Sequence, residues 1–140
     1  VNGRCMLAHA AKWQGRRAVN HILGHEDNIR FDIMPSAIFT YPEAASVGPS
    51  EEALKEKGME YTVTKNFFRA NGKALAIDET EGMMKLIAGK DGRIISCHMY
   101  GAHSADIVQE VSALMNTDIT IDQLNDIIHI HPTLGEILVR

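Results

Sequence analysis

The chain has 140 residues, of which 45% are hydrophobic and 23% charged, a size and composition typical of one globular domain with a small extension. A net charge of −4 with scattered Lys and Arg residues argues against a nucleic-acid partner. No apolar run approaches the roughly 20 residues that cross a bilayer, and no signal peptide is recognisable. We therefore expect a cytoplasmic protein without membrane contact.

The first residue is Val rather than Met, and the first segment has the pattern of the middle of a longer protein, so we expect a fragment. Cys5 and Cys97 fit neither a CxxC redox motif nor a zinc spacing. We expect both thiols to be buried as small apolar residues, and a disulfide between them stays open.

An amphipathic helix is the first element that the sequence predicts. Apolar residues between 6 and 23 recur at helical spacing, and Gly24 follows where such a helix would end. Residues 25–35 are polar at first and end in a proline, which is typical of a linker. Two short strands are expected next, at 37–40 and 44–47, separated by a turn at Tyr41-Pro42.

A second group of strands follows a short helix. Ser50 is a suitable N-cap for that helix and Gly58 a suitable end. Residues 60–68 are rich in β-branched and aromatic side chains, and the further strands 83–89 and 93–99 flank Asp91-Gly92, a pair preferred in tight hairpin turns. Together these segments predict an antiparallel sheet of about four strands.

Helical periodicity returns after Ser104, where a stripe of apolar residues predicts a helix of about 13 residues. Short helices are expected to begin at Thr120 and at Thr133. Strands thus precede helices, and no βαβ unit repeats. The pattern favours an α+β fold, a two-layer sandwich of an antiparallel β-sheet with helices.

The stretch HIHPTLGE, residues 129–136, has three interpretations. Thr133 and Glu136 have the spacing of a capping box at a helix start. His129 and His131 point the same way along an extended segment, as metal ligands would, but no third ligand has a diagnostic spacing and we expect no metal. His131 and Glu136 can also form an acid–base pair, in which the carboxylate holds one ring nitrogen.

HIHPTLGE resembles the histidine-proline-threonine signature that closes the pyridine nucleotide-disulfide oxidoreductases, and His129 is similar to the extra histidine of their dihydrolipoamide dehydrogenase branch. Other stretches resemble the family in the same order, namely MLAHAA at 6–11, AIFTYPEAASVG at 37–48, RANGKALAIDETEGMMKLI at 69–87 and MYGAHSADIVQEVSALM at 99–115. The resemblance implies a dimerisation (interface) domain at 27–140 that forms a homodimer. It also implies that 1–26 are the C-terminal helix of an FAD-binding domain.

The same resemblance implies roles for particular residues. His131 would be the catalytic base and Glu136 its orienting partner, taking a proton from a substrate thiol in the active site of the other subunit. The N–H groups of the helix that starts in the segment Met6, Leu7, Ala8 and His9 would face the FAD. The implied reaction is oxidation of dihydrolipoamide, free or on a lipoyl-bearing protein, with NAD as acceptor.

Some features depart from the family's pattern. Arg4-Cys5 differ from its usual residues, and these 140 residues contain neither a GxGxxG loop nor a CxxxxC disulfide. FAD and NAD would therefore be bound mostly by parts of the parent absent from this chain, and the chain alone would be inactive. Two alternatives stay open, a glutathione reductase type of enzyme, against which His129 argues, and a free-standing dimerisation module.

Overall fold

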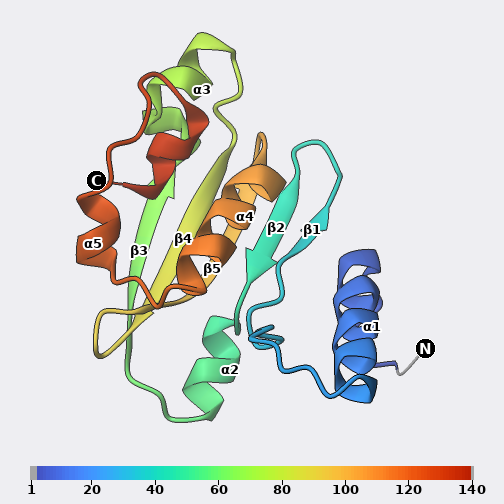
Figure 1. The fold of residues 1–140 in the computed structure, drawn as a ribbon. Helices are drawn as coiled ribbons and strands as arrows, with labels where there is room; N and C mark the ends of the chain where they lie inside the picture. Colours follow the sequence, from blue (N-terminus) through green and yellow to red (C-terminus); the bar gives the residue numbers. More distant parts are fainter. Residues whose placement is uncertain (1–2, 140) are drawn as a thin grey trace.

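One antiparallel sheet organises the structure, a computed structural model that describes residues 3–139 (Figure 1). The strands lie in the order β1-β2-β5-β4-β3, and their bounds are Ser36–Ile38 for β1, Ala44–Val47 for β2, Tyr61–Phe67 for β3, Gly82–Gly89 for β4 and Ile94–Gly101 for β5. Every predicted strand is present. The expected sheet of about four strands is nevertheless one strand too small, because β2 pairs with both β1 and β5.

The β4–β5 hairpin closes at the Asp-Gly turn that the sequence predicts. The Gly89 N–H donates to the Arg93 carbonyl at 2.9 Å, and Gly92 adopts a left-handed φ of 79°. The Asp91 side chain accepts the Arg93 N–H at 3.1 Å, which stiffens the turn. Because the turn sets the register of the two strands, it decides which side chains face the helices and which face away.

Helices cover one face of the sheet and confirm the predicted α+β sandwich (Figure 1). The longest of them on this face, α4 (Ser104–Met115), packs along β2 and β5, and α5 (Ile121–Asn125) and the 3-10 helix η2 (Leu134–Leu138) complete the layer. The core between the layers joins strand residues to the apolar stripe of α4, and its buried members include Met84, Leu86, Cys97, Ile107, Val111 and Leu124. Burial of each large aliphatic side chain contributes roughly 1.5–3 kcal/mol.

Helix α2 (Glu51–Glu56) covers one end of the other face of the sheet. Ser50 caps it as expected, since its hydroxyl accepts the Ala53 N–H at 3.2 Å. Leu54 is buried, and Glu51 binds Lys85 of β4 at 3.3 Å. These contacts anchor α2 to the sheet.

Two short elements between β3 and β4 are absent from the sequence prediction. They are the 3-10 helix η1 (Phe68–Ala70) and α3 (Gly72–Ala76). Asn71 begins α3, because its side-chain oxygen accepts the Ala74 N–H at 3.0 Å. A helix of five residues is too short to show a helical period, which explains why the pattern did not reveal it.

Helix α1 (Ala8–Ile22) stands beside the sheet rather than on it (Figure 1). Arg17 ties it to the following segment through the Asp27 carboxylate at 2.6 Å and the Ile29 carbonyl at 2.8 Å. The helix starts at Ala8, two residues later than expected, and Ile22 is 80% exposed at its end. None of the helices in the described residues is long and apolar enough to cross a membrane. The division between 1–26 and 27–140 stays a prediction.

We expect Gly101→Ala to lower the free energy of unfolding by about 1–3 kcal/mol, because overpacking displaces rings and backbone. Gly101 has a φ of 137°, and a methyl group there would overlap the fully buried ring of Phe68. Urea unfolding followed by circular dichroism measures the loss. Gly15→Ala in α1, where a methyl group meets nothing within 4 Å, is the control and should not destabilise. Equal stabilities of the two variants would contradict this packing argument.

Candidate acid–base site

The candidate site lies near the end of the chain, where His131 and Glu136 are in contact. His131 Nδ1 and Glu136 Oε1 are 2.9 Å apart, and Glu136 Oε2 accepts the Thr133 N–H at 2.8 Å. One carboxylate thus serves the histidine and the helix start together, so the contacts expected for the capping box and for the acid–base pair coexist. Ile137 and Leu138, which follow Glu136, are buried and anchor this turn in the core.

Hydrogen bonds keep the Glu136 carboxyl ionised. The Thr133 N–H and, after it, the His131 ring hold the pKa of this carboxyl below its ordinary value, while partial desolvation opposes them. An ionised carboxylate only accepts hydrogen bonds, so Nδ1 of His131 carries the proton between them. In the neutral ring the lone pair is then on Nε2, and the side chain is 78% exposed. The arrangement suits a base that takes a proton at Nε2.

A cavity of about 420 Å³ opens beside this pair. Its walls include Lys65, Asn66 and Phe67 of β3 and Asn71 at the start of α3, in addition to His131 and Glu136. The Asn66 and Asn71 side chains donate hydrogen bonds to carbonyls of the terminal segment. Neither residue is among the predicted site residues, because an asparagine has no distinctive spacing and these contacts join segments more than sixty residues apart.

His129 has different partners from His131. Its Nε2 lies 3.2 Å from Glu110 Oε1, its Nδ1 lies 3.0 Å from the Ile127 carbonyl oxygen, and its side chain is only 9% exposed. The two rings therefore do not face a common ligand. In the part of the chain that the structure describes, no group of three or more His, Cys, Asp or Glu side chains is arranged to hold a metal ion.

The segment predicted to face a flavin spans the start of α1. Leu7 is the extended N-cap residue and Met6, which is 96% exposed, precedes it, so only Ala8 and His9 belong to the helix. No side chain caps this end, and no acidic residue lies in its first turn. His9 Nε2 lies 2.7 Å from the Pro35 carbonyl oxygen, which ties the helix start to the segment before β1.

The two cysteines differ in burial. Cys97 is fully buried in the core, as expected, whereas Cys5 is only half-buried, and both are free thiols. Burial raises the pKa of the Cys97 thiol to about 12. The expectation that both thiols are buried is therefore correct for Cys97 and wrong for Cys5, which lies outside the core beside α1.

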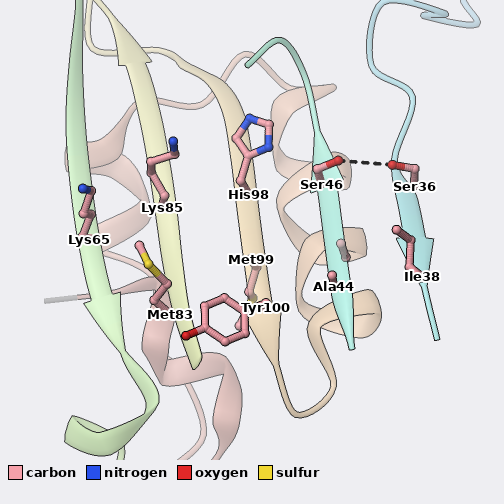
Figure 2. Close-up of a pocket in the computed structure, with 11 residues that line it drawn as sticks. Ser36, Ile38, Ala44, Ser46, Lys65, Met83, Lys85, His98, Met99 and Tyr100 are labelled. Carbon is pink, nitrogen blue, oxygen red and sulfur yellow. Dashed lines mark hydrogen bonds between the residues drawn. The ribbon is translucent and has the colours of Figure 1, made fainter. Parts of the chain in front are cut away.

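A second concavity, of about 460 Å³, lies on the open face of the sheet (Figure 2). Strand pairing places a polar row there, formed by Lys65, Lys85, His98, Ser46 and Ser36. Lys85 binds Glu51 at 3.3 Å, and His98 Nε2 lies 2.8 Å from the Ser96 hydroxyl and 3.1 Å from the Pro49 carbonyl oxygen. These contacts tie Lys85 and His98 to the end of the sheet where α2 lies. The positions of these two side chains therefore have a structural explanation.

Residues 34–140 match the family model described as "Pyridine nucleotide-disulphide oxidoreductase, dimerisation domain". The chain belongs to this family. The match confirms the resemblance that the order of the motifs indicated, and it covers the sheet, the helix layer and the His131–Glu136 segment. Helix α1 lies before the matched residues.

Curated relatives of the chain are oxidoreductases of the same family. A dihydrolipoyl dehydrogenase of Bacillus subtilis is 41% identical over 135 residues, which cover 96% of this chain and 29% of that protein. A dihydrolipoyl dehydrogenase of Chlamydia muridarum is 37% identical over 138 residues, which cover 98% of this chain and 30% of that protein. The chain therefore spans less than a third of the length of these relatives.

Solved structures share the fold. LpdA from Mycobacterium tuberculosis superposes with a TM-score of 0.87 at 24% identity, covering 95% of this chain and 29% of that chain. The HOCl-induced flavoprotein disulfide reductase RclA from Escherichia coli gives a TM-score of 0.86 at 23% identity, covering 97% of this chain and 32% of that chain. At these identities the two structures support the fold alone.

We expect the pKa of the Glu136 carboxyl to rise in a His131→Gln variant but to stay below its ordinary value. The reason is that the Thr133 N–H lowers this pKa more than the ring does. Because the folded-state pKa is depressed, the contribution to stability is present at neutral pH and is lost as the pH falls through that pKa. Carbon-13 NMR of labelled glutamate carboxyls, followed across the acid pH range, measures the pKa of Glu136 in the wild-type protein and in the variant. An unchanged pKa would contradict the ring contact, and a return to the ordinary value would contradict the dominance of Thr133.

We expect Cys97 to resist alkylation in the folded protein. With a pKa of about 12, only about one molecule in ten thousand carries its thiolate near pH 8. Iodoacetamide followed by peptide mass spectrometry should find Cys5 modified first and Cys97 modified only after unfolding. Modification of the two thiols at equal rates in the native protein would contradict the burial of Cys97.

Proposed function

We propose that the chain is the C-terminal part of a flavin-dependent dihydrolipoamide dehydrogenase, which converts dihydrolipoamide and NAD⁺ to lipoamide and NADH. In this proposal it supplies the homodimer surface and the acid–base pair His131–Glu136, and it is inactive alone. The observation that carries the proposal is the single carboxylate that binds both His131 Nδ1 and the Thr133 N–H. Relatives that are dihydrolipoyl dehydrogenases support the choice of this enzyme over other disulfide reductases.

The proposed step at this site is a proton transfer. The substrate presents a thiol, and only its thiolate attacks a disulfide efficiently. His131 Nε2 accepts the thiol proton, and the Glu136 carboxylate stabilises the positive charge that then appears on the ring. A base placed in this way contributes typically about 10²–10⁴ in rate.

The start of α1 fits the electronegative edge of a flavin. Its first N–H groups have no side-chain cap. Its first turn contains no acidic side chain, so negative charge would not be repelled there. In the proposal, the segment Met6, Leu7, Ala8 and His9 approaches the FAD, while the rest of the FAD site and the NAD site belong to other parts of the parent. The bound flavin would supply the redox chemistry between the dithiol and NAD.

A homodimer is part of the proposal, because His131 would serve the active site of the other subunit. Ile128 is 96% exposed and Ile130 is 80% exposed, and both lie within three residues of the exposed ring of His131. Exposed apolar side chains beside a candidate base support a surface that a second subunit covers. A lipoyl-bearing protein as substrate and a cytoplasmic location complete the proposal.

In the complete protein, we expect His131→Gln to reduce turnover of dihydrolipoamide by about 10²–10⁴ while the flavin stays bound, because the variant lacks the base. Steady-state formation of NADH measures turnover, and the visible spectrum measures flavin content. NADH oxidation by an artificial acceptor that takes electrons directly from the flavin should change little. His25→Gln, which changes an exposed histidine beyond α1, is the matched control. Normal dihydrolipoamide turnover in His131→Gln would refute the assignment of the base.

A further inference from the structure

Asn71 is a buried polar side chain at the wall of the candidate site. It is only 7% exposed and lies at the N-cap of α3, where its Oδ1 accepts the Ala74 N–H at 3.0 Å. Burial of an amide is costly unless both its ends are hydrogen-bonded, so the partners of its other end matter.

The amide nitrogen of Asn71 binds the segment that carries the acid–base pair. Its Nδ2 donates to the Thr133 carbonyl oxygen at 3.1 Å and lies 3.4 Å from the Leu134 carbonyl oxygen. Asn66 makes a parallel contact further along, where its Nδ2 donates to the Ile137 carbonyl oxygen at 2.7 Å. Two amides from the β3–α3 region therefore hold the backbone on both sides of Glu136.

We propose that Asn71 is a positioning residue that sets the geometry of the His131–Glu136 pair. This inference rests on the proposed function of that pair. The Asn71 amide binds the Thr133 carbonyl, and the Thr133 N–H donates to Glu136 Oε2. The other carboxylate oxygen holds His131 Nδ1. A continuous series of hydrogen bonds thus runs from Asn71 to the proposed base.

The size of the expected effect follows from the demands of proton transfer. A displacement of about 1 Å in a catalytic group can reduce the rate about 10²-fold. The His131 side chain is largely exposed, so neighbouring side chains of the described chain restrain it little beyond the contact with Glu136. Loosening of the Thr133 backbone is therefore expected to reach the ring through the carboxylate.

Asn71→Asp in the complete enzyme separates the two roles of this side chain. Aspartate is as good an N-cap as asparagine, so the bond to the Ala74 N–H is kept. An ionised carboxylate cannot donate to the carbonyls of Thr133 and Leu134, so the contact with the terminal segment is lost. Asn71→Thr also keeps a cap and introduces no charge, but its hydroxyl is too short to reach both carbonyls.

We expect both variants to lower kcat for dihydrolipoamide about 10-fold or more. Flavin content and NADH oxidation by an artificial acceptor should stay within about twofold, since neither passes through the base. Ser50→Asp, which introduces the same carboxylate at the N-cap of α2, should leave all three measurements unchanged. If Asn71→Asp yields no flavoprotein, Asn71→Thr carries the test, and equal losses in both activities would overturn the positioning role.

A double-mutant cycle with Glu136→Gln distinguishes action through the pair from a separate structural defect. If Asn71 acts through Glu136, its replacement should cost less than about twofold once Glu136 is replaced. A full and independent loss in that background would overturn the proposal. Normal dihydrolipoamide turnover in both Asn71 variants would also overturn it, while the base would still stand if His131→Gln is inactive. Absence of dihydrolipoamide turnover in the wild-type enzyme would instead refute the proposed function.

Discussion

The Glu136 carboxylate divides its two oxygens between a backbone N–H and an imidazole, and the candidate site depends on this division. The Thr133 N–H fixes the carboxylate relative to the chain, and the remaining oxygen then has one direction in which to hold His131. Because both contacts favour the ionised form, they also lower the pKa of the carboxyl. A permanent acceptor at Nδ1 in turn selects the ring tautomer with its lone pair on Nε2.

Tertiary structure holds this arrangement in place, because the residues involved are far apart in the sequence. Buried Ile137 and Leu138 anchor the far side of Glu136 in the core, where Asn66 also binds the Ile137 carbonyl, and Asn71 binds the Thr133 carbonyl on the near side. The imidazole ring of His131, which precedes this anchored segment, is largely exposed. A rigid support beneath an accessible base is the combination that acid–base chemistry on an external substrate requires.

Much of the fold could be predicted from the sequence, because its strands and long helices have clear periods and turn signals. The Asp91-Gly92 hairpin and the Ser50 cap are examples in which a local residue preference decided the structure. The full width of the sheet and the helix α3 could not be predicted in this way. Pairing of β2 with β5 is a long-range contact. Helix α3 is too short to show a helical period, and its N-cap residue Asn71 is held at its other end by carbonyls more than sixty residues away.

The candidate site shows the same division between local and long-range information. Spacing within HIHPTLGE allowed a capping box, a metal clip and an acid–base pair, and the contacts of Glu136 explain how the first and the third share one carboxylate. The start of α1 was expected two residues early, since Met6 and Leu7 have apolar side chains that fit the helical pattern without belonging to the helix. The helix begins only at Ala8 because the backbone of Leu7 is extended, which the side-chain pattern does not reveal.

Nitrogen-15 NMR of His131 in the complete enzyme tests the central claim most directly. We expect that the neutral form of the ring carries its proton on Nδ1 and a lone pair on Nε2, and that Glu136→Gln changes the Nδ1 resonance. A ring protonated on Nε2 alone, or an Nδ1 resonance indifferent to Glu136→Gln, would contradict it.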